Sequence, residues 1–356
     1  MINIFSFFAG TGLLDLGFED AGFNIVHVDE MNSAFLKCYR FARRNRFYTP
    51  CYGWSNDDIQ LYLDDDYWHN KFPLKMDCDL IGFLGGPPCP DFSIAGRNAG
   101  VSGKNGKLTD VYMQLIIKRQ PDFFVFENVK GLYNTKKHRE YYDSMKEQLT
   151  AANFMVFDSL ENALWYGVPQ DRKRLFLIGF NRNKFGTDLT YNFGNNRVFN
   201  DEEINEIEWP TESPFREGSK LKCPPKIIKE LTIEYWFKKN RVLNHPNGKE
   251  YFKPHNLEKF YSIPEGHSQG KSFKRLHRWK FSPTAAYGNN EVHLHPYFAR
   301  RLSVAEVMAI QSLPTEFRLP ENISLSSKFK MIANGVPYLL SLGIAQELKK
   351  WLEYHI

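Results

Sequence analysis

The sequence has few cysteines and no long apolar run. Its 356 residues include five cysteines, and no two of them form a C-x-x-C pair. An odd number of scattered cysteines argues against a disulfide framework or a structural zinc site, and it predicts a reducing, cytoplasmic location. No apolar stretch approaches the ~20 residues of a membrane-spanning helix, and the first residues lack the basic flank of a signal peptide. We therefore expect no membrane association and no metal.

Positive charge is concentrated in one part of the chain. The net charge is +5, but residues 215–301 hold 18 lysines and arginines against 7 acidic residues, a net of +11, whereas the remainder carries −6. Aromatic residues and histidines are interleaved with these basic residues, among them Trp279, Phe281 and His295. This combination favours a nucleic-acid partner held by a basic segment of an acidic body. An ordinary solvated surface is the alternative.

Strand-like and helix-like segments alternate over the first half of the chain, which predicts an α/β fold with a parallel sheet and crossover helices. The expected strands are 2–7, 24–28, 80–84, 122–126, 155–160 and 174–180, and the expected helices are 13–21, 33–44, 110–119 and 138–151. After Gly179 and up to about residue 299 the chain is irregular and rich in Pro, Asn, Gly and Lys. Helical patterns return after Arg301 and over 336–352. We therefore expect an α/β body that is interrupted late by a basic module.

Two features predict a nucleoside site at the start of the chain. The first expected strand ends in residues 8–12, FAGTG, whose alternate glycines let the backbone approach a ligand closely. The pair Asp29 and Glu30 closes the second strand, where an acid binds ribose hydroxyls in doubly wound folds. NAD and S-adenosylmethionine both fit such a site. Asp15 stands where a dinucleotide fold has its third glycine, which disfavours a pyrophosphate ligand and a nicotinamide oxidoreductase.

Three further segments carry reactive side chains. Residues 85–93, GGPPCPDFS, place Cys89 on a stiff turn after a strand, where a nucleophile is as reasonable as a small buried thiol. Glu127 follows four apolar residues and so lies at the same sheet edge, unless it is a helix N-cap. Residues 170–174, QDRKR, direct Arg172 and Arg174 to the same side, either as a solvated face or as a fork for a carbonyl or phosphate oxygen.

These motifs, in this order, resemble those of the DNA cytosine-5 methyltransferases. The resembling segments are 8–12, Glu30, 58–59, 86–93, 127–129, 170–174, 301–306, 311–314 and 334–336. The resemblance covers residues 1–181 and 299–356, and it departs from the family pattern at Leu13, Pro90 and Ala333. It implies a Rossmann-like, S-adenosylmethionine-dependent methyltransferase fold: an α/β mixed sheet with a second, smaller target-recognition domain.

The resemblance also implies a domain plan and an activity. A catalytic domain would span 1–181, a target-recognition domain 182–299, a hinge 300–330, and a C-terminal helix within 331–356 would return to the catalytic domain. The activity would be methyl transfer from S-adenosyl-L-methionine to C5 of a cytosine flipped out of double-stranded DNA. The implied setting is a bacterial or phage-encoded cytoplasmic monomer, with a cognate restriction endonuclease as a partner through genetic association only.

The resemblance assigns roles to individual residues. Cys89 would add to C6 of cytosine, Glu127 would neutralise N3, Arg172 would stabilise the thiolate and Arg174 would bind O2. The implied cofactor contacts are Phe8, Gly10, Gly12, Glu30, Asp58, Pro87, Leu108, Asn334 and Val336. The expected DNA contacts are Ser93, Arg97, Lys104, Arg275, Arg278 and Lys280, with 91–107 as a lid that closes on glycine hinges. Segment 275–284 is equally well an edge strand of the smaller domain.

Two other readings of the same motifs remain open. A tRNA cytosine-5 methyltransferase would share the fold, although the large basic module disfavours it. A catalytically silent nucleic-acid-binding homologue is disfavoured by the presence of Cys89, Glu127 and Arg174.

Overall fold

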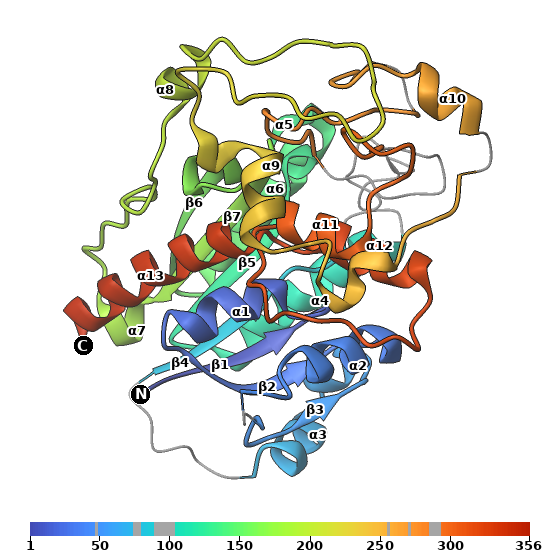
Figure 1. Cartoon of the computed structure of the whole chain (residues 1–356). Helices are drawn as coiled ribbons and strands as arrows, with labels where there is room; N and C mark the ends of the chain where they lie inside the picture. The colour runs from blue at the N-terminus through green and yellow to red at the C-terminus, as the bar shows by residue number, and fades with distance from the viewer. Residues whose placement is uncertain (47–48, 74–79, 89–103, 255–256, 270–271, 285–292) are drawn as a thin grey trace.

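The computed structural model describes all residues except 47–48, 74–79, 89–103, 255–256, 270–271 and 285–292 (Figure 1). The predicted nucleophile Cys89 and the predicted DNA contacts Ser93 and Arg97 lie outside the described residues, as does most of the expected lid. Lys104 is the first residue of a helix, but its side chain is not described.

One seven-stranded sheet, in the order β3-β2-β1-β4-β5-β7-β6, forms the centre of the fold (Figure 1). Its strands are β1 (Ile2–Phe7), β2 (Asn24–Asp29), β3 (Trp54–Ser55), β4 (Leu80–Gly85), β5 (Phe123–Val129), β6 (Phe154–Asn162) and β7 (Lys173–Asn181). The mixed α/β sheet is thus confirmed. A parallel arrangement throughout is wrong, because β7 runs antiparallel to both β5 and β6. Residues 163–172 between β6 and β7 are too few for a parallel crossover with its helix.

Helices cover both faces of this sheet. One face carries α1 (Leu13–Asp20), α2 (Ser33–Ala42) and α13 (Tyr338–His355). The other face carries η1 (Ile59–Leu63), α3 (Asp65–Lys71), α4 (Lys104–Arg119), α5 (Lys130–Asn134) and α6 (Lys136–Ala151). Among the described residues no helix is long and apolar enough to cross a membrane.

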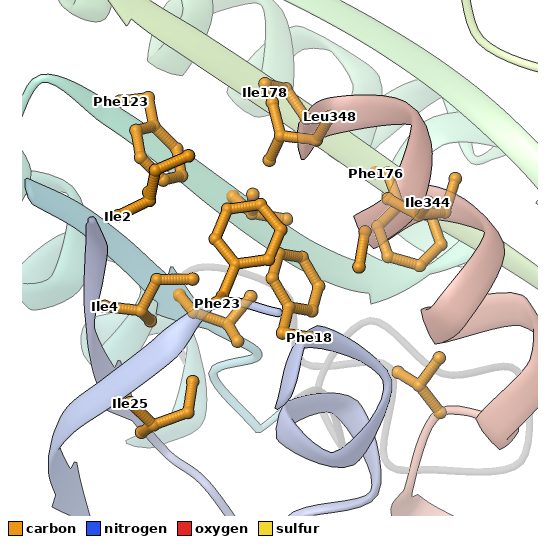
Figure 2. Packing of buried hydrophobic residues seen from close by; sticks show 14 of the residues in the cluster. Ile2, Ile4, Phe18, Phe23, Ile25, Phe123, Phe176, Ile178, Ile344 and Leu348 are labelled. Atoms are coloured by element: carbon orange, nitrogen blue, oxygen red, sulfur yellow. The ribbon is translucent and has the colours of Figure 1, made fainter. Parts of the chain in front are cut away.

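The two faces of β1 belong to different cores. All six of its residues are buried, as in a parallel strand that is covered on both sides. Ile2 and Ile4 meet Phe18 of α1 and Ile344 of α13 in one cluster (Figure 2). Phe5 and Phe7 belong to the cluster on the opposite face. The sheet is therefore the middle layer of three, and the carboxyl ends of its parallel strands form one edge.

A further core lies beneath the irregular part of the chain. The helices there are α7 (Arg182–Phe185), α8 (Asp201–Asn205), α9 (Ile233–Lys239), α10 (Leu257–Ser262), α11 (Val304–Ile310) and α12 (Leu325–Asn334). Residues of α9, α11 and α12 share this core with Leu13 and Leu16 of α1. Leu189 and Tyr191, by contrast, pack into the core that contains α13. The start of the predicted recognition segment therefore packs against the sheet side of the molecule.

Candidate active site

The glycine-containing turn lies at the carboxyl end of β1. Phe8, Gly10 and Gly12 have φ values of 54°, 60° and 74°, so three residues of this short turn are left-handed. A Cβ added to Gly10 would meet no atom within 4 Å. Thr11 Oγ1 is buried and has no hydrogen-bond partner among the described residues. The turn therefore leaves open space beside Gly10 for a ligand.

Glu30 joins this turn to the end of β2. Its two carboxylate oxygens accept hydrogen bonds from the Gly10 amide (2.8 Å) and the Asn32 amide (2.8 Å). Burial raises the pKa of Glu30, and these two amides oppose the shift. Since a carboxylate has about four acceptor positions, Glu30 keeps capacity for ligand hydroxyls after making these two bonds.

The acidic residues after β3 take different positions. Asp58 is exposed and caps η1, accepting from the Gln60 amide (3.0 Å). Its neighbour Asp57 instead pairs with Lys71 and accepts from the Tyr67 hydroxyl (2.5 Å). Asp58, the predicted cofactor contact, is therefore the member of this pair that is not held by a cation.

Glu127 and Arg174 form a buried ion pair on the sheet. In the antiparallel register Glu127 lies opposite Phe176 and Arg174 lies opposite Val129, so the two side chains are diagonal neighbours on one face. Glu127 Oε1 is 3.1 Å from Arg174 Nε. Burial raises the pKa of Glu127, while Arg174 and Arg172 oppose the rise. The N-cap alternative is wrong, because Glu127 lies inside β5 and the N-cap of α5 is Val129.

Gly86 is the nearest described part of the cysteine loop to this pair. A Cβ on Gly86 would lie 2.8 Å from Glu127 Oε2. The loop that bears Cys89 in sequence therefore leaves the sheet directly against the Glu127 carboxylate, and any side chain at Gly86 would press on that carboxylate. Pro87, a predicted cofactor contact, is buried next to it in sequence.

Arg172 is buried and faces the end of α12. Its Nη2 donates to the carbonyl oxygens of Ala333 (2.7 Å) and Gly335 (3.0 Å). The predicted thiolate partner is thus tied to the segment that contains Asn334 and Val336. Leu13 explains why no side chain stands at Gly335, since a Cβ there would be 2.5 Å from Leu13 Cδ2. The departure from the family pattern at Leu13 is accommodated by this contact.

The other predicted cofactor contacts lie around the same edge. Val336 is buried in the core with α13, whereas Asn334, the last residue of α12, is exposed. Leu108 of α4 is partly buried against the core that contains Phe7. These positions leave Asn334 free to contact a ligand and give Val336 a packing role.

Arg275 and Arg278 were expected on a DNA-binding surface, but both are buried. Arg275 donates to the carbonyl oxygens of Ile263 (2.9 Å) and His295 (2.5 Å). Arg278 pairs with Glu265 at 2.8 Å. Such satisfied guanidinium groups hold irregular segments together, because each one supplies five donors to backbone that has few partners of its own. A solvent-facing position is therefore wrong for both. Lys280 is only partly buried and lines a cavity of about 140 Å³.

Several contacts that position residues 170–174, the segment that holds Arg172 and Arg174, were not identified from the sequence. Asn162 Oδ1 accepts from the Arg172 amide (3.1 Å), and Gln170 Nε2 donates to Gln311 Oε1 (3.3 Å). The Asp171 amide donates to the Ser282 carbonyl at 2.8 Å. Gln170 and Gln311 each stand in a recognised motif, but sequence spacing alone does not show that the two side chains meet.

Comparisons with known proteins place these features in a family. The family model for C-5 cytosine-specific DNA methylases matches residues 2–350. The type II methyltransferase M.NmeDI of Neisseria meningitidis serogroup C is 50% identical, over 99% of this chain and 84% of its own. The type II methyltransferase M.MthTI of Methanothermobacter thermautotrophicus is 28% identical, over 99% and 98%.

Solved structures agree on the fold. An E. coli prophage protein described as a DNA modification methyltransferase superimposes with a TM-score of 0.66 at 21% identity, covering 99% of this chain and 100% of that one. The S. pombe Dnmt2 methyltransferase superimposes with a TM-score of 0.64 at 12% identity, covering 99% of both chains. Together with the sequence relatives, the mixed sheet and the ordered motifs, these matches show that the chain belongs to the C-5 cytosine-specific DNA methylases and is a DNA (cytosine-5-)-methyltransferase.

Proposed function

We propose that this enzyme is the modification enzyme of a type II restriction–modification system, and that it methylates one cytosine in a short duplex sequence with S-adenosylmethionine as donor. The observation that carries the proposal is the buried Glu127–Arg174 pair against Gly86, at the same sheet edge as the turn that Glu30 holds. The 50% identity to a type II methyltransferase supports the biological setting.

The residues at the end of β1 fit the methyl donor. The open space beside Gly10 leaves room for a ligand, and Glu30 has acceptor capacity for ribose hydroxyls. Asp58 and Asn334, which are both exposed, would complete the contacts. When bound, S-adenosylmethionine supplies an electrophilic methyl group on a sulfonium, which an activated C5 can attack.

Cytosine C5 is a poor nucleophile, so the protein must activate it. We assign Cys89 to addition at C6, which breaks the aromatic ring and makes C4–C5 an enamine. Negative charge then moves toward N3, where Glu127 donates a proton or a hydrogen bond. Arg174 binds O2 and holds the ring in register. After methylation a base removes the C5 proton, and Cys89 leaves by elimination.

The environment of Glu127 suits this acid role. Burial raises its pKa, so the protonated form is more available than for an ordinary glutamate. The pairing with Arg174 opposes this shift and orients the carboxylate. A carboxyl poised in this way can donate to N3 when sulfur adds and take the proton back afterwards.

The target cytosine must leave the duplex stack before Cys89 can reach C6. Flipping costs a few kcal/mol, and phosphate contacts from basic residues can offset that cost. We assign target recognition to the basic segment within 182–299, with Lys280 as its remaining predicted side-chain contact among the described residues. The division into a catalytic part, a recognition part and a hinge at 300–330 forms part of this proposal.

The test is methyl transfer together with trapping of the covalent adduct. Tritium from labelled S-adenosylmethionine is followed into unmethylated plasmid DNA, into tRNA and into a reaction without acceptor. We expect counts in DNA only. Duplex DNA that contains 5-fluorocytosine should remain bound to the wild-type protein in denaturing gels, because fluorine cannot leave as a proton does and elimination stops.

Two cysteine variants make this test specific. Cys89→Ala should abolish both turnover and the denaturation-resistant adduct, whereas Cys223→Ala, which removes a partly buried thiol elsewhere, should keep both. Counts in tRNA and not in DNA would overturn the substrate assignment. Full turnover by Cys89→Ala would overturn the covalent mechanism.

A further inference from the structure

A buried charged network that the proposed mechanism does not use lies beneath the glycine-containing turn. It consists of Asp15 and Glu19 of α1 with Tyr39 and Arg43 at the end of α2. Arg43 and Tyr39 are almost fully buried, and so is Asp15. Asp15 occupies the position where a dinucleotide-binding fold has a glycine, so this chain puts a carboxyl where such folds need close packing. The proposed chemistry gives this network no role.

Arg43 connects this network to the backbone of the turn. Its Nη2 donates to the Gly12 carbonyl (2.7 Å) and its Nη1 to the Thr11 carbonyl (3.4 Å). Its Nε pairs with Glu19 Oε1 at 2.6 Å. One planar guanidinium thus fixes two successive carbonyl groups of the turn and is itself neutralised by an acid of the following helix.

Tyr39 contacts Arg43 with its ring, and it binds Asp15 of α1 with its hydroxyl. The Arg43 guanidinium carbon lies 3.7 Å from the centre of the Tyr39 ring. The Tyr39 hydroxyl donates to Asp15 Oδ2 (2.9 Å), and Ser6 Oγ of β1 donates to Asp15 Oδ1 (2.9 Å). Strand β1, helix α1 and helix α2 therefore meet at this network, directly under the turn that leads from β1 to α1.

The turn is packed onto the network without room for a side chain. A Cβ on Gly12 would lie 2.3 Å from Tyr39 Cε2 and 2.5 Å from Arg43 Nη1. Gly12 is also the left-handed N-cap of α1 and has no side-chain cap. The turn is therefore closed at Gly12 by Arg43 and Tyr39, whereas a Cβ on Gly10 would meet no atom within 4 Å.

We propose that Arg43 is a positioning residue for the methyl donor, holding the Thr11 and Gly12 carbonyls so that the left-handed turn is already formed before the ligand binds. This inference rests on the proposed role of the turn as the donor site. Residues other than glycine are strained in the left-handed conformation. Phe8 therefore keeps this conformation only if its surroundings impose it. A turn that is formed in advance spares the ligand the entropy cost of ordering it.

Arginine is required here for a geometric reason. A lysine would keep the charge opposite Glu19, but it cannot direct two donors to successive carbonyls and a third to a carboxylate. Arg43→Lys should therefore raise the Kd for S-adenosylmethionine about tenfold, as expected for one lost charge-assisted hydrogen bond. The KM for DNA should change less than about twofold, because the network does not reach the basic segment.

The experiment measures the binding of the methyl donor and, separately, the order of the turn in the ligand-free protein. Calorimetry gives the Kd for S-adenosylmethionine, and hydrogen exchange of the amides of residues 10–16 in the ligand-free protein gives the order of the turn. Both should change in Arg43→Lys. Tyr39→Phe provides a milder second variant, which removes the hydroxyl on Asp15 but keeps the ring under Arg43, and it should shift both readouts in the same direction by less.

Two controls separate positioning from general destabilisation. Arg44→Lys alters an exposed neighbour on the same helix end and should leave both readouts at wild-type values. Leu149→Ala opens a cavity under α6 on the other face, so it should lower Tm yet keep the donor Kd. Wild-type Kd and wild-type exchange in Arg43→Lys would overturn the inference. Failure of the wild-type protein to bind S-adenosylmethionine would overturn the proposed function instead, and the exchange readout would still decide whether Arg43 orders the turn.

Discussion

Glu127 is the ionisable residue whose surroundings bear most directly on the chemistry. Replacing it by glutamine keeps its size and one acceptor, but an amide cannot transfer a proton to N3. We expect Glu127→Gln to lower kcat by about 10²–10⁴-fold, the usual range for a lost general acid. Methyl-transfer kinetics at saturating DNA and donor measure this. A variant with wild-type kcat would show that Glu127 does not carry the proton.

The close contact of Gly86 with Glu127 predicts a steric effect of adding a methyl group at this position. A Cβ there would lie 2.8 Å from Glu127 Oε2, so Gly86→Ala must displace either the carboxylate or the loop. We expect a fall in kcat of about tenfold or more with little change in Tm, because a misplacement of about 1 Å in an active site is costly. Gly218→Ala would meet no atom within 4 Å but places a Cβ at a φ of 65°, so it should lower Tm through backbone strain and keep the wild-type kcat. Equal kcat values for Gly86→Ala and wild type would contradict the contact.

At the residue scale the sequence predicted the donors and acceptors of the site but not their partners. Glu127 and Glu30 could be placed because strand ends and apolar runs mark the sheet edge. Arg275 and Arg278 could not, since a basic residue in an irregular segment looks the same whether it faces DNA or satisfies buried carbonyls. Only the three-dimensional path of the backbone decides between these two environments.

Among the elements, α8 and α11 begin with the same capping box in different surroundings. Glu306 of α11, which is buried, accepts from the buried Ser303 amide (2.7 Å) and from the partly buried Arg300 (2.7 and 2.8 Å). Burial by itself would raise the pKa of Glu306, but His295 and Arg300 hold it well below the ordinary value. In α8 the corresponding Asn200–Glu203 box is exposed.

This contrast predicts that replacing glutamate by glutamine lowers the free energy of unfolding by different amounts in the two capping boxes. Glu306→Gln should lower the free energy of unfolding by about 3–5 kcal/mol, since it removes the buried charge that the partly buried Arg300 pairs with. Glu203→Gln should cost about 1 kcal/mol or less. Urea unfolding at pH 7 measures both. Equal costs for the two variants would show that burial of the pair adds nothing.

The sequence predicted long periodic elements better than short ones. The bounds of β1 are as expected, and α1, α6 and β4 differ by one or two residues. The two-residue strand β3 was missed because two residues give no periodicity, and α12 was missed as well. The direction of β7 also escapes local patterns, since alternation of side chains is the same in parallel and antiparallel strands.

For the molecule as a whole, buried carboxyl groups make stability depend on pH. Burial raises the pKa of Asp15 and of Asp29 to about 6, from 3.8. The folded state therefore holds more protons than the unfolded state between about pH 4 and pH 6. The stabilisation from these groups is complete below about pH 4 and is lost as the pH rises through about 6.

Asp15→Asn tests this pH dependence. The carboxyl faces Arg43, Glu19 and Tyr39, and an amide in its place cannot ionise. Its free energy of unfolding should vary less with pH between 4 and 6 than that of the wild type. Asp66→Asn, at an exposed position of α3, should keep the wild-type slope. Parallel curves for wild type and Asp15→Asn would contradict the assignment.

The uneven distribution of charge predicts that salt weakens the binding of DNA more than the binding of the methyl donor. Residues 215–301 carry a net charge of +11, so DNA binding should release counterions while donor binding should not. Between about 50 and 200 mM salt we expect the KM for DNA to rise by at least about tenfold, with a change of less than about twofold in the donor Kd. A donor Kd that follows salt as steeply as the DNA KM would contradict this separation.

The contact between α1 and α13 has a consequence for synthesis on the ribosome. Ile4 and Phe18 share their core with Ile344 and Leu348, which are made more than three hundred residues later (Figure 2). The part of the apolar surface of α1 and β1 that α13 covers therefore stays exposed until α13 has been translated. We expect nascent chains that stop before residue 338 to need a chaperone, and the sheet to become protease-resistant only after that helix is released.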